Sequence, residues 1–169
     1  MRKDITRMTR MTTSNTSKGI EIVEGKVLKL KNVLSKELLS RDPMETQREA
    51  YMFESYVKSK GLKPYGPSIV KTEAFFDNRA LTERKTMMVQ LREVPDRIES
   101  PYAFEDLVRV ENCLLARYRG GMANLSMAYA KLQLHAFEGD ITLKGSTYTI
   151  IVEQNEGGIV ADVFAEMQR

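Results

Sequence analysis

The order of strand-like and helix-like segments repeats once along the chain, and this repetition constrains the fold more than any other sequence feature. In chain order, the expected elements are a strand over 19–34, a helix over 43–60, strands over 68–75 and 84–94, a strand over 103–118, a helix over 121–138, and strands over 145–154 and 159–168. The repeat is one of pattern and not of sequence identity. It predicts an α+β fold of two β-α-β-β units with pseudo-two-fold symmetry, an antiparallel sheet and two main helices.

The two helices are marked by their ends and by the spacing of their apolar residues. Asp42 is a typical capping residue, and Pro43 suits the first helical position. Gly61 and Gly139 are expected to end the first and the second helix. The expected buried stripes are Ala50, Phe53 and Val57 on the first helix, and Met122, Leu125, Tyr129, Leu132 and Ala136 on the second.

The strands are bounded by turn signals. The polar stretch 77–83 is expected to be a turn, and Pro95 and Pro101 mark a loop after the strand over 84–94. The last strand alternates between two faces. One face carries Ile159, Ala161, Val163 and Ala165, and the other carries Val160, Asp162, Phe164 and Glu166.

Length and charge indicate one domain behind a basic segment. A chain of 169 residues with 42% hydrophobic residues can bury its own core. Residues 1–18 hold five basic residues and one acidic residue, and the remaining 21 basic and 22 acidic residues leave the body near −1. We therefore expect a disordered basic leader over 1–18 and a single domain over 19–169. The charge of that domain does not indicate nucleic-acid binding.

Few residues suggest metal or covalent chemistry. The single cysteine, Cys113, is followed by Leu114 and Leu115, which predicts a buried, inert thiol and fits a cytoplasmic protein. His135 is the only histidine and has no companions at ligand spacing, so no metal site is expected. Gly120-Gly121 is interpreted as a tight turn before a helix, and no cofactor motif is present. No apolar run is long enough to span a bilayer, so no membrane association is expected.

Several segments together resemble a known family. Residues 115–134, LARYRGGMANLSMAYAKLQL, are similar to the signature of the GyrI-like small-molecule-binding domain, which is also the effector-binding part of some multidrug transcription regulators. The matching positions are Gly120, Leu125, Ala128, Tyr129 and Leu132 in that segment, Tyr65, Gly66 and Pro67 before one strand, Gly145 to Tyr148 before another, and Asp162 to Glu166 in the closing strand. The resemblance spans about residues 19–168.

The resemblance implies a ligand groove between the two units, in a stand-alone form without a DNA-binding domain. One departure concerns charge. Many family members carry a Glu directly after the Tyr of the third matching point, and this sequence has Thr149 there. Glu153 lies four residues further along the same strand face. The departure weakens the expectation of a cationic ligand. It also weakens the expectation of the hydrolase activity, by a Glu and a Tyr acting together, that some relatives imply.

The leading hypothesis is a module that binds a small apolar or aromatic molecule, cationic or not, in the groove. The predicted ligand-binding residues are Tyr65, Tyr118, Tyr148, Glu153, Phe164 and Glu166. Aromatic walls would give affinity and a carboxylate would select cations. The alternative is a protein-interaction or accessory protein, an inhibitor or adaptor that uses the same groove. A hydrolase is the least favoured function, and the ligand, the partner and the oligomeric state stay open.

Overall fold

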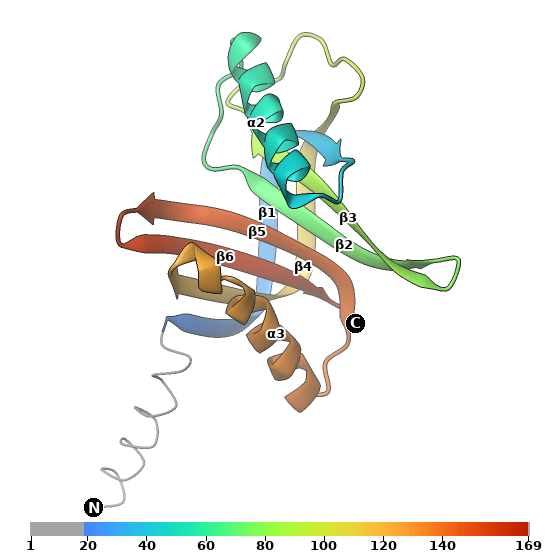
Figure 1. The fold of residues 1–169 in the computed structure, drawn as a ribbon, viewed down its shortest axis with the longest axis vertical. Coiled ribbons are helices and arrows are strands. Elements are labelled where there is room, and N and C mark those ends of the chain that lie inside the picture. The colour runs from blue at the N-terminus through green and yellow to red at the C-terminus, as the bar shows by residue number, and fades with distance from the viewer. Residues whose placement is uncertain (1–18, 169) are drawn as a thin grey trace, which may run out of the picture.

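The computed structural model describes residues 19–168, so the predicted leader over 1–18 lies outside the described residues. The elements are β1 (Ile20–Leu38), α2 (Pro43–Ser59), β2 (Ile69–Asp77), β3 (Ala80–Gln90), β4 (Ala103–Gly120), the short 3-10 helix η1 (Met122–Asn124), α3 (Ser126–Glu138), β5 (Leu143–Asn155) and β6 (Gly158–Met167). Figure 1 shows the strands between the two α-helices. The order β-α-β-β occurs twice, which confirms the predicted fold class.

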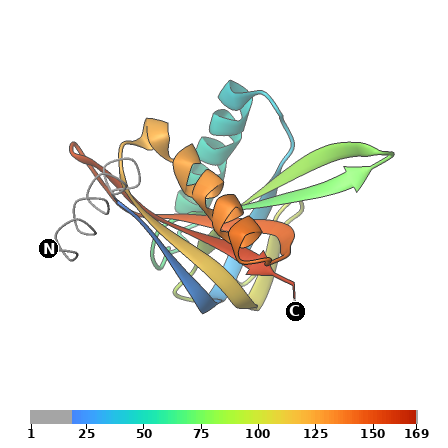
Figure 2. The same ribbon diagram turned by 90° about the horizontal axis from the view of Figure 1, so that it is seen from below.

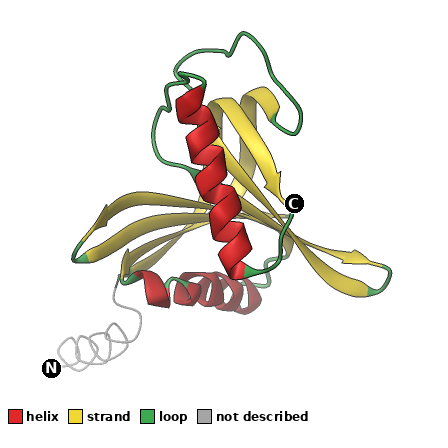
Figure 3. Cartoon of the chain, turned by 45° about the horizontal axis from the view of Figure 1, so that its top comes forward, coloured by secondary structure: helices red, strands yellow, loops and turns green. Residues whose placement is uncertain are grey.

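The strands of the described chain form one closed antiparallel barrel in the order β1-β3-β2-β5-β6-β4. β1 pairs with β4 and β2 pairs with β5, so both seams between the two units are strand pairs. α2 and α3 lie outside the barrel (Figure 3), where α2 packs on β1 and β3, and α3 packs on β4, β6 and the start of β1. No helix within residues 19–168 is long and apolar enough to cross a membrane.

Three clusters of buried side chains form the core. The cluster beneath α2 comprises Leu34, Leu38, Phe53, Val57, Met87, Val89 and Leu91. The cluster beneath α3 is built around Leu114, Ala116, Tyr118, Leu132, Val163 and Ala165. The third cluster contains strand residues alone and therefore occupies the barrel interior: Leu28, Leu30, Val33, Ile69, Met88, Val110, Cys113 and Tyr148. The strand face that carries this third cluster is called the inner face below.

The strand register reveals the pseudo-two-fold relation of the two units. Across the β2–β5 seam Ile69 pairs with Ile150 and Lys71 pairs with Tyr148. A two-fold axis through the intervening Val70–Thr149 pair places Ile69 on Tyr148 and Lys71 on Ile150. The backbone obeys the same relation, because a glycine with positive φ stands three residues before Ile69 and Tyr148 alike, Gly66 at 89° and Gly145 at 97°.

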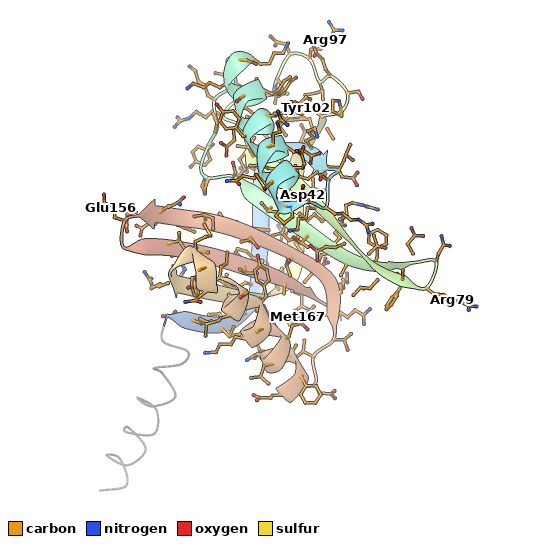
Figure 4. The ribbon with its side chains drawn as sticks, viewed as in Figure 1. Asp42, Arg79, Arg97, Tyr102, Glu156 and Met167 are labelled. Atoms are coloured by element: carbon orange, nitrogen blue, oxygen red, sulfur yellow. The ribbon has the colours of Figure 1, made fainter. Side chains whose placement is uncertain are left out.

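The predicted helices are present, with one correction at the start of the second. Phe53 and Val57 are buried on α2, and Leu132 and Ala136 are buried on α3. The expected membership of Met122 in the buried stripe is wrong. Met122 lies in η1, ahead of the first turn of α3, and is 48% exposed. The Asp42 side chain accepts a hydrogen bond from the Met44 backbone N–H at 3.1 Å, as expected of a cap (Figure 4).

The polar turn predicted over 77–83 is shorter than expected. Only Asn78 and Arg79 form the turn, both with positive φ, at 50° and 68°. A two-residue loop of this kind matches the twist of a hairpin, so the flanking polar residues continue the strands. The hairpin projects from the barrel with Arg79 at its tip (Figures 2 and 4). β3 also ends earlier than predicted, because beyond Gln90 only Leu91 bridges to the loop, at Pro64.

Candidate ligand-binding site

The inner face at the β2–β5 seam carries a row of polar and aromatic side chains. Lys71 on β2 pairs with Tyr148 on β5, which pairs with Phe164 on β6, so these three side chains are neighbours on one face. Glu73 and Glu166 lie two residues further along β2 and β6 and share that face. These five residues are called the mouth cluster, because here the inner face meets solvent: Tyr148 is buried, and the other four are partly exposed.

The Lys71 ammonium lies over the ring of Tyr148. Its Nζ is 5.5 Å from the ring centroid, within cation–π range, and 3.1 Å from Oε1 of Glu73. The side chains of Lys71 and Glu73 are only 26% and 27% exposed. Because water is partly excluded, this ion pair interacts more strongly than one on the open surface.

Further ion pairs extend the mouth cluster on both sides. On the hairpin side, Arg84 Nη1 lies 3.6 Å from Glu73, and Arg84 Nε lies 3.5 Å from Glu37. On the other side, Lys144 Nζ lies 3.1 Å from Glu166 Oε1. Each side opens into a surface depression. Glu37, Arg84 and Phe75 line one of about 490 Å³, and Glu166, Lys144 and Arg109 line one of about 660 Å³.

The surroundings keep the two central groups in their ordinary protonation states. Burial by itself lowers the pKa of Lys71, but the Tyr148 hydroxyl and the Glu73 carboxylate outweigh burial, and the pKa is raised. Burial raises the pKa of Tyr148, against the opposing charge of Lys71. At neutral pH the mouth cluster therefore presents an ammonium beside an un-ionised phenol.

The surroundings of Cys113 and His135 bear on the prediction that neither side chain takes part in chemistry. Cys113 is fully buried, and its Sγ donates to the Val110 carbonyl at 3.6 Å. Burial, with the nearby Glu166 charge, raises the pKa of the thiol to about 11, so the nucleophilic thiolate is disfavoured. His135 lies 3.7 Å from Glu24 on the outside of the barrel. Within residues 19–168 no group of three or more His, Cys, Asp or Glu side chains is placed to hold a metal ion.

Of the six predicted ligand-binding residues, the structure brings Tyr148, Phe164 and Glu166 together. Tyr118 lies on the opposite face of the sheet, packed beneath α3, and its hydroxyl donates to the Gly121 carbonyl at 2.6 Å. Its side chain therefore points away from the mouth cluster.

Tyr65 and Glu153 also lie apart from the mouth cluster. Tyr65 is 60% exposed in the loop after α2, and the Arg92 guanidinium lies 5.8 Å from its ring centroid. Glu153 is near the far end of β5, beside a depression of about 200 Å³ that Arg119 also lines. The separation of these residues narrows the candidate site to one end of the barrel.

Thr149, which stands where many GyrI-like domains carry Glu, faces α3. Its hydroxyl shares a short hydrogen bond with the hydroxyl of Tyr129 on that helix. A side chain at this position of β5 therefore points to the helix layer and not to the mouth cluster.

Two members of the mouth cluster, Lys71 and Glu73, were not predicted from the sequence. The alternation of β2 places Ile69, Lys71 and Glu73 on one face, and this signal is present in the sequence. What the sequence lacks is the register that sets Lys71 opposite Tyr148. A charged residue on a two-faced strand otherwise suggests a solvent-exposed face.

A second polar pair on the inner face is structural. Arg117 donates two hydrogen bonds to Asp162, from Nε and Nη2, each at 2.7 Å, and Asp162 is 8% exposed. The two hydrogen bonds satisfy both carboxylate oxygens and join β4 to β6. The Asp162 carboxylate is thus already paired.

Comparison with known proteins gives no match to a family model and none to a curated protein sequence. Solved structures do match. The EcmrR C-terminal domain aligns over 89% of this chain and 98% of its own length, with 12% identity and a TM-score of 0.70. EcmrR in its complex with DNA aligns over 99% of this chain and 68% of its own, again with 12% identity and a TM-score of 0.70. SAV2435 bound to tetraphenylphosphonium aligns over 86% of this chain and 94% of its own, with 8% identity and a TM-score of 0.50.

These similarities concern the fold. At such low identity the common property is the arrangement of two β-α-β-β units, and the neighbours agree with the GyrI-like small-molecule-binding domain that the sequence motifs predicted. The chain therefore has the fold of that domain class. Any conclusion about the ligand and the binding site therefore has to rest on the side chains of this chain.

Proposed function

We propose that this protein is a binding module for a small apolar or aromatic molecule, taken up at the mouth cluster between the two units. The observation that carries the proposal is the row Lys71, Tyr148 and Phe164 across the β2–β5–β6 strands. Aromatic surface and a partly desolvated ion pair meet there beside two surface depressions. Apolar walls with a few converging polar groups are typical of small-molecule sites.

The structural neighbours support this proposal. SAV2435 was solved with tetraphenylphosphonium, a bulky aromatic ion, so a protein of this fold accommodates such a ligand. EcmrR forms a complex with DNA, and the part that this chain resembles includes its C-terminal domain. A domain of the same fold in this chain would bind the ligand and pass the binding event on to another component.

A thermal-shift screen tests the proposal. The full chain is heated with neutral aromatic compounds, aromatic anions and aromatic cations, because a compound that binds the native state alone raises the melting temperature. We expect at least one class to give a dose-dependent increase, and Tyr148→Ala to abolish that increase. Tyr65→Ala is the matched control, since Tyr65 lies outside the mouth cluster and is 60% exposed. A screen in which no class shifts the melting temperature would reject the proposal.

A protein partner is the second candidate function, and the β2–β3 hairpin favours it. Phe76 and Leu81 pair directly across this hairpin and are 77% and 69% exposed. The barrel interior is filled with the chain's own side chains, and the projecting hairpin offers an apolar surface that is accessible to a partner (Figure 2). A photo-crosslinking residue at position 76 should then yield one discrete adduct in cells. The same residue at position 137, where Phe137 is 84% exposed on α3, should not.

A further inference from the structure

The charges around the mouth cluster are balanced within the chain. Glu73 is paired with Lys71 and Arg84, Arg84 also reaches Glu37, and Glu166 is paired with Lys144. These six side chains comprise three cations and three carboxylates, so their net charge is zero. Each of the three carboxylates already has a cationic partner within 4 Å, as the distances above show. A positively charged ligand would therefore meet no surplus negative charge here.

The Lys71 ammonium occupies a position that favours a cation. An organic cation gains from the face of an aromatic ring and from a nearby carboxylate. The Lys71 ammonium already has both, with the Tyr148 ring centroid at 5.5 Å and a Glu73 oxygen at 3.1 Å. An incoming cation would have to displace this ammonium or lie beside it, and like charges a few ångströms apart in a partly dry site repel strongly.

The positive charge of Lys71 is not a requirement of the fold. Its pseudo-two-fold counterpart in the second unit is Ile150, which packs against the interior cluster. The same strand position thus accepts an apolar side chain in an otherwise equivalent backbone. The charge at position 71 is therefore a local feature of the first unit, at the end of the barrel where Tyr148 lies.

We propose that Lys71 is a built-in cation that makes the mouth cluster exclude organic cations and select aromatic ligands that are uncharged or negatively charged. This inference rests on the proposed function, and it specifies the ligand class. The ammonium has three N–H donors, of which Glu73 and the Tyr148 hydroxyl engage two. An anionic group of a ligand would accept from this ammonium while the aromatic part contacts Tyr148 and Phe164.

Tetraphenylborate and tetraphenylphosphonium give a direct test, because the two ions match in size and shape and differ in charge sign. Calorimetric titration of the full chain should show at least about tenfold tighter binding of the anion. Lys71→Met shortens the side chain by only one atom and removes the charge, so Glu73 keeps Arg84 as its cationic partner and the six side chains carry a net charge of −1 beside Tyr148. In this variant the preference should reverse in favour of the cation by about tenfold.

Two further variants separate the local effect of Lys71 from general charge effects. Lys71→Met combined with Glu73→Gln should lose the new preference for the cation, because the second substitution removes the surplus negative charge. Lys29→Met changes the net charge by the same amount as Lys71→Met, but Lys29 is exposed on the outer face between the interior residues Leu28 and Leu30. It should keep the wild-type ratio of affinities.

The outcomes distinguish this inference from the proposed function. Wild-type protein that binds both ions equally, or Lys71→Met protein with an unchanged affinity ratio, would overturn the role of Lys71 and leave the binding function standing. Failure of the wild type and of every variant to bind either ion would contradict the proposed function and this inference with it.

Discussion

Asn32 and Asn112 occupy equivalent positions in the two units, and both adopt a left-handed backbone conformation. Their φ angles are 50° and 60°. Each stands directly before the residue at which its strand begins to pair with its own unit's hairpin. Val33 pairs with Gln90, and Cys113 pairs with Glu166. The two asparagines thus mark the points where β1 and β4 begin to pair with their own units, while the β1–β4 pairing continues at their other edge.

Substitutions at Asn112 test this backbone requirement. Positive φ is costly for a β-branched residue and free for glycine. Asn112→Val should lower the free energy of unfolding by about 1–2 kcal/mol, whereas Asn112→Gly should stay within about 0.5 kcal/mol of the wild type. Urea unfolding followed by circular dichroism measures both values. Equal losses for Val and Gly would show that the asparagine side chain matters and its φ does not.

The pair of Arg117 and Asp162 should contribute measurably to stability. Asp162→Ala leaves the Arg117 guanidinium without the acceptor of its two hydrogen bonds on a partly buried face. We expect the free energy of unfolding in urea to fall by about 2 kcal/mol. The matched control is Glu99→Gln, which removes an exposed pair with Lys60 at 3.8 Å. This control should cost less than about 0.5 kcal/mol. A similar cost for both substitutions would contradict a structural role of the Arg117–Asp162 pair.

Cys113 should make stability depend on pH under alkaline conditions. Its pKa is about 11 in the fold and near 9 for an unburied thiol, so the unfolded chain loses the proton first. Below the unfolded pKa the thiol contributes no pH dependence, and above it stability falls as pH rises toward the folded pKa. At about pH 10 the loss should be about 1 kcal/mol, measured as the difference in alkaline slope between wild type and Cys113→Ala. Identical slopes in the two proteins would show that the thiol is not protected.

Gly145 should tolerate no side chain, in contrast to Gly121. Gly145 has a φ of 97°, and a Cβ there would lie 2.9 Å from the Ala74 carbonyl oxygen on the neighbouring strand. Gly145→Ala should cost about 2 kcal/mol or more. Gly121 has a φ of −75° and open space around it, so Gly121→Ala should be nearly neutral. Differential scanning calorimetry of the two variants compares them directly, and an unperturbed Gly145→Ala melting temperature would refute the close approach.

Most of the architecture could be predicted from the sequence because it depends on local chemistry. The spacing of Phe53 and Val57 predicts a helix, and Asp42 marks its start, since both signals act within a few residues. The predicted extent of the turn over 77–83 was wrong, because polar composition alone did not reveal that Asn78 and Arg79 suffice for a hairpin. Closure of the sheet into a barrel depends on long-range pairing, which local patterns do not encode.

The candidate site was predicted in part for the same reason. Phe164 and Glu166 were correctly assigned to one face of the last strand by their alternation, and the structure adds Tyr148 beside them. Lys71 was missed because its neighbour across the seam is set by register. Tyr118 was included for its residue type, although its strand parity turns it toward α3.

Methionine methyl NMR during titration with an aromatic ligand tests the central claim most directly. Met88 packs in the interior cluster with Tyr148, whereas Met44, Met52 and Met127 are exposed on the outer helices. We predict saturable shifts of the Met88 methyl signal, caused by the aromatic ligand at the mouth cluster, with the three helix methyl signals unchanged. Saturable shifts confined to the helix methionines, or no saturable shift at any methionine, would contradict ligand binding at the mouth cluster.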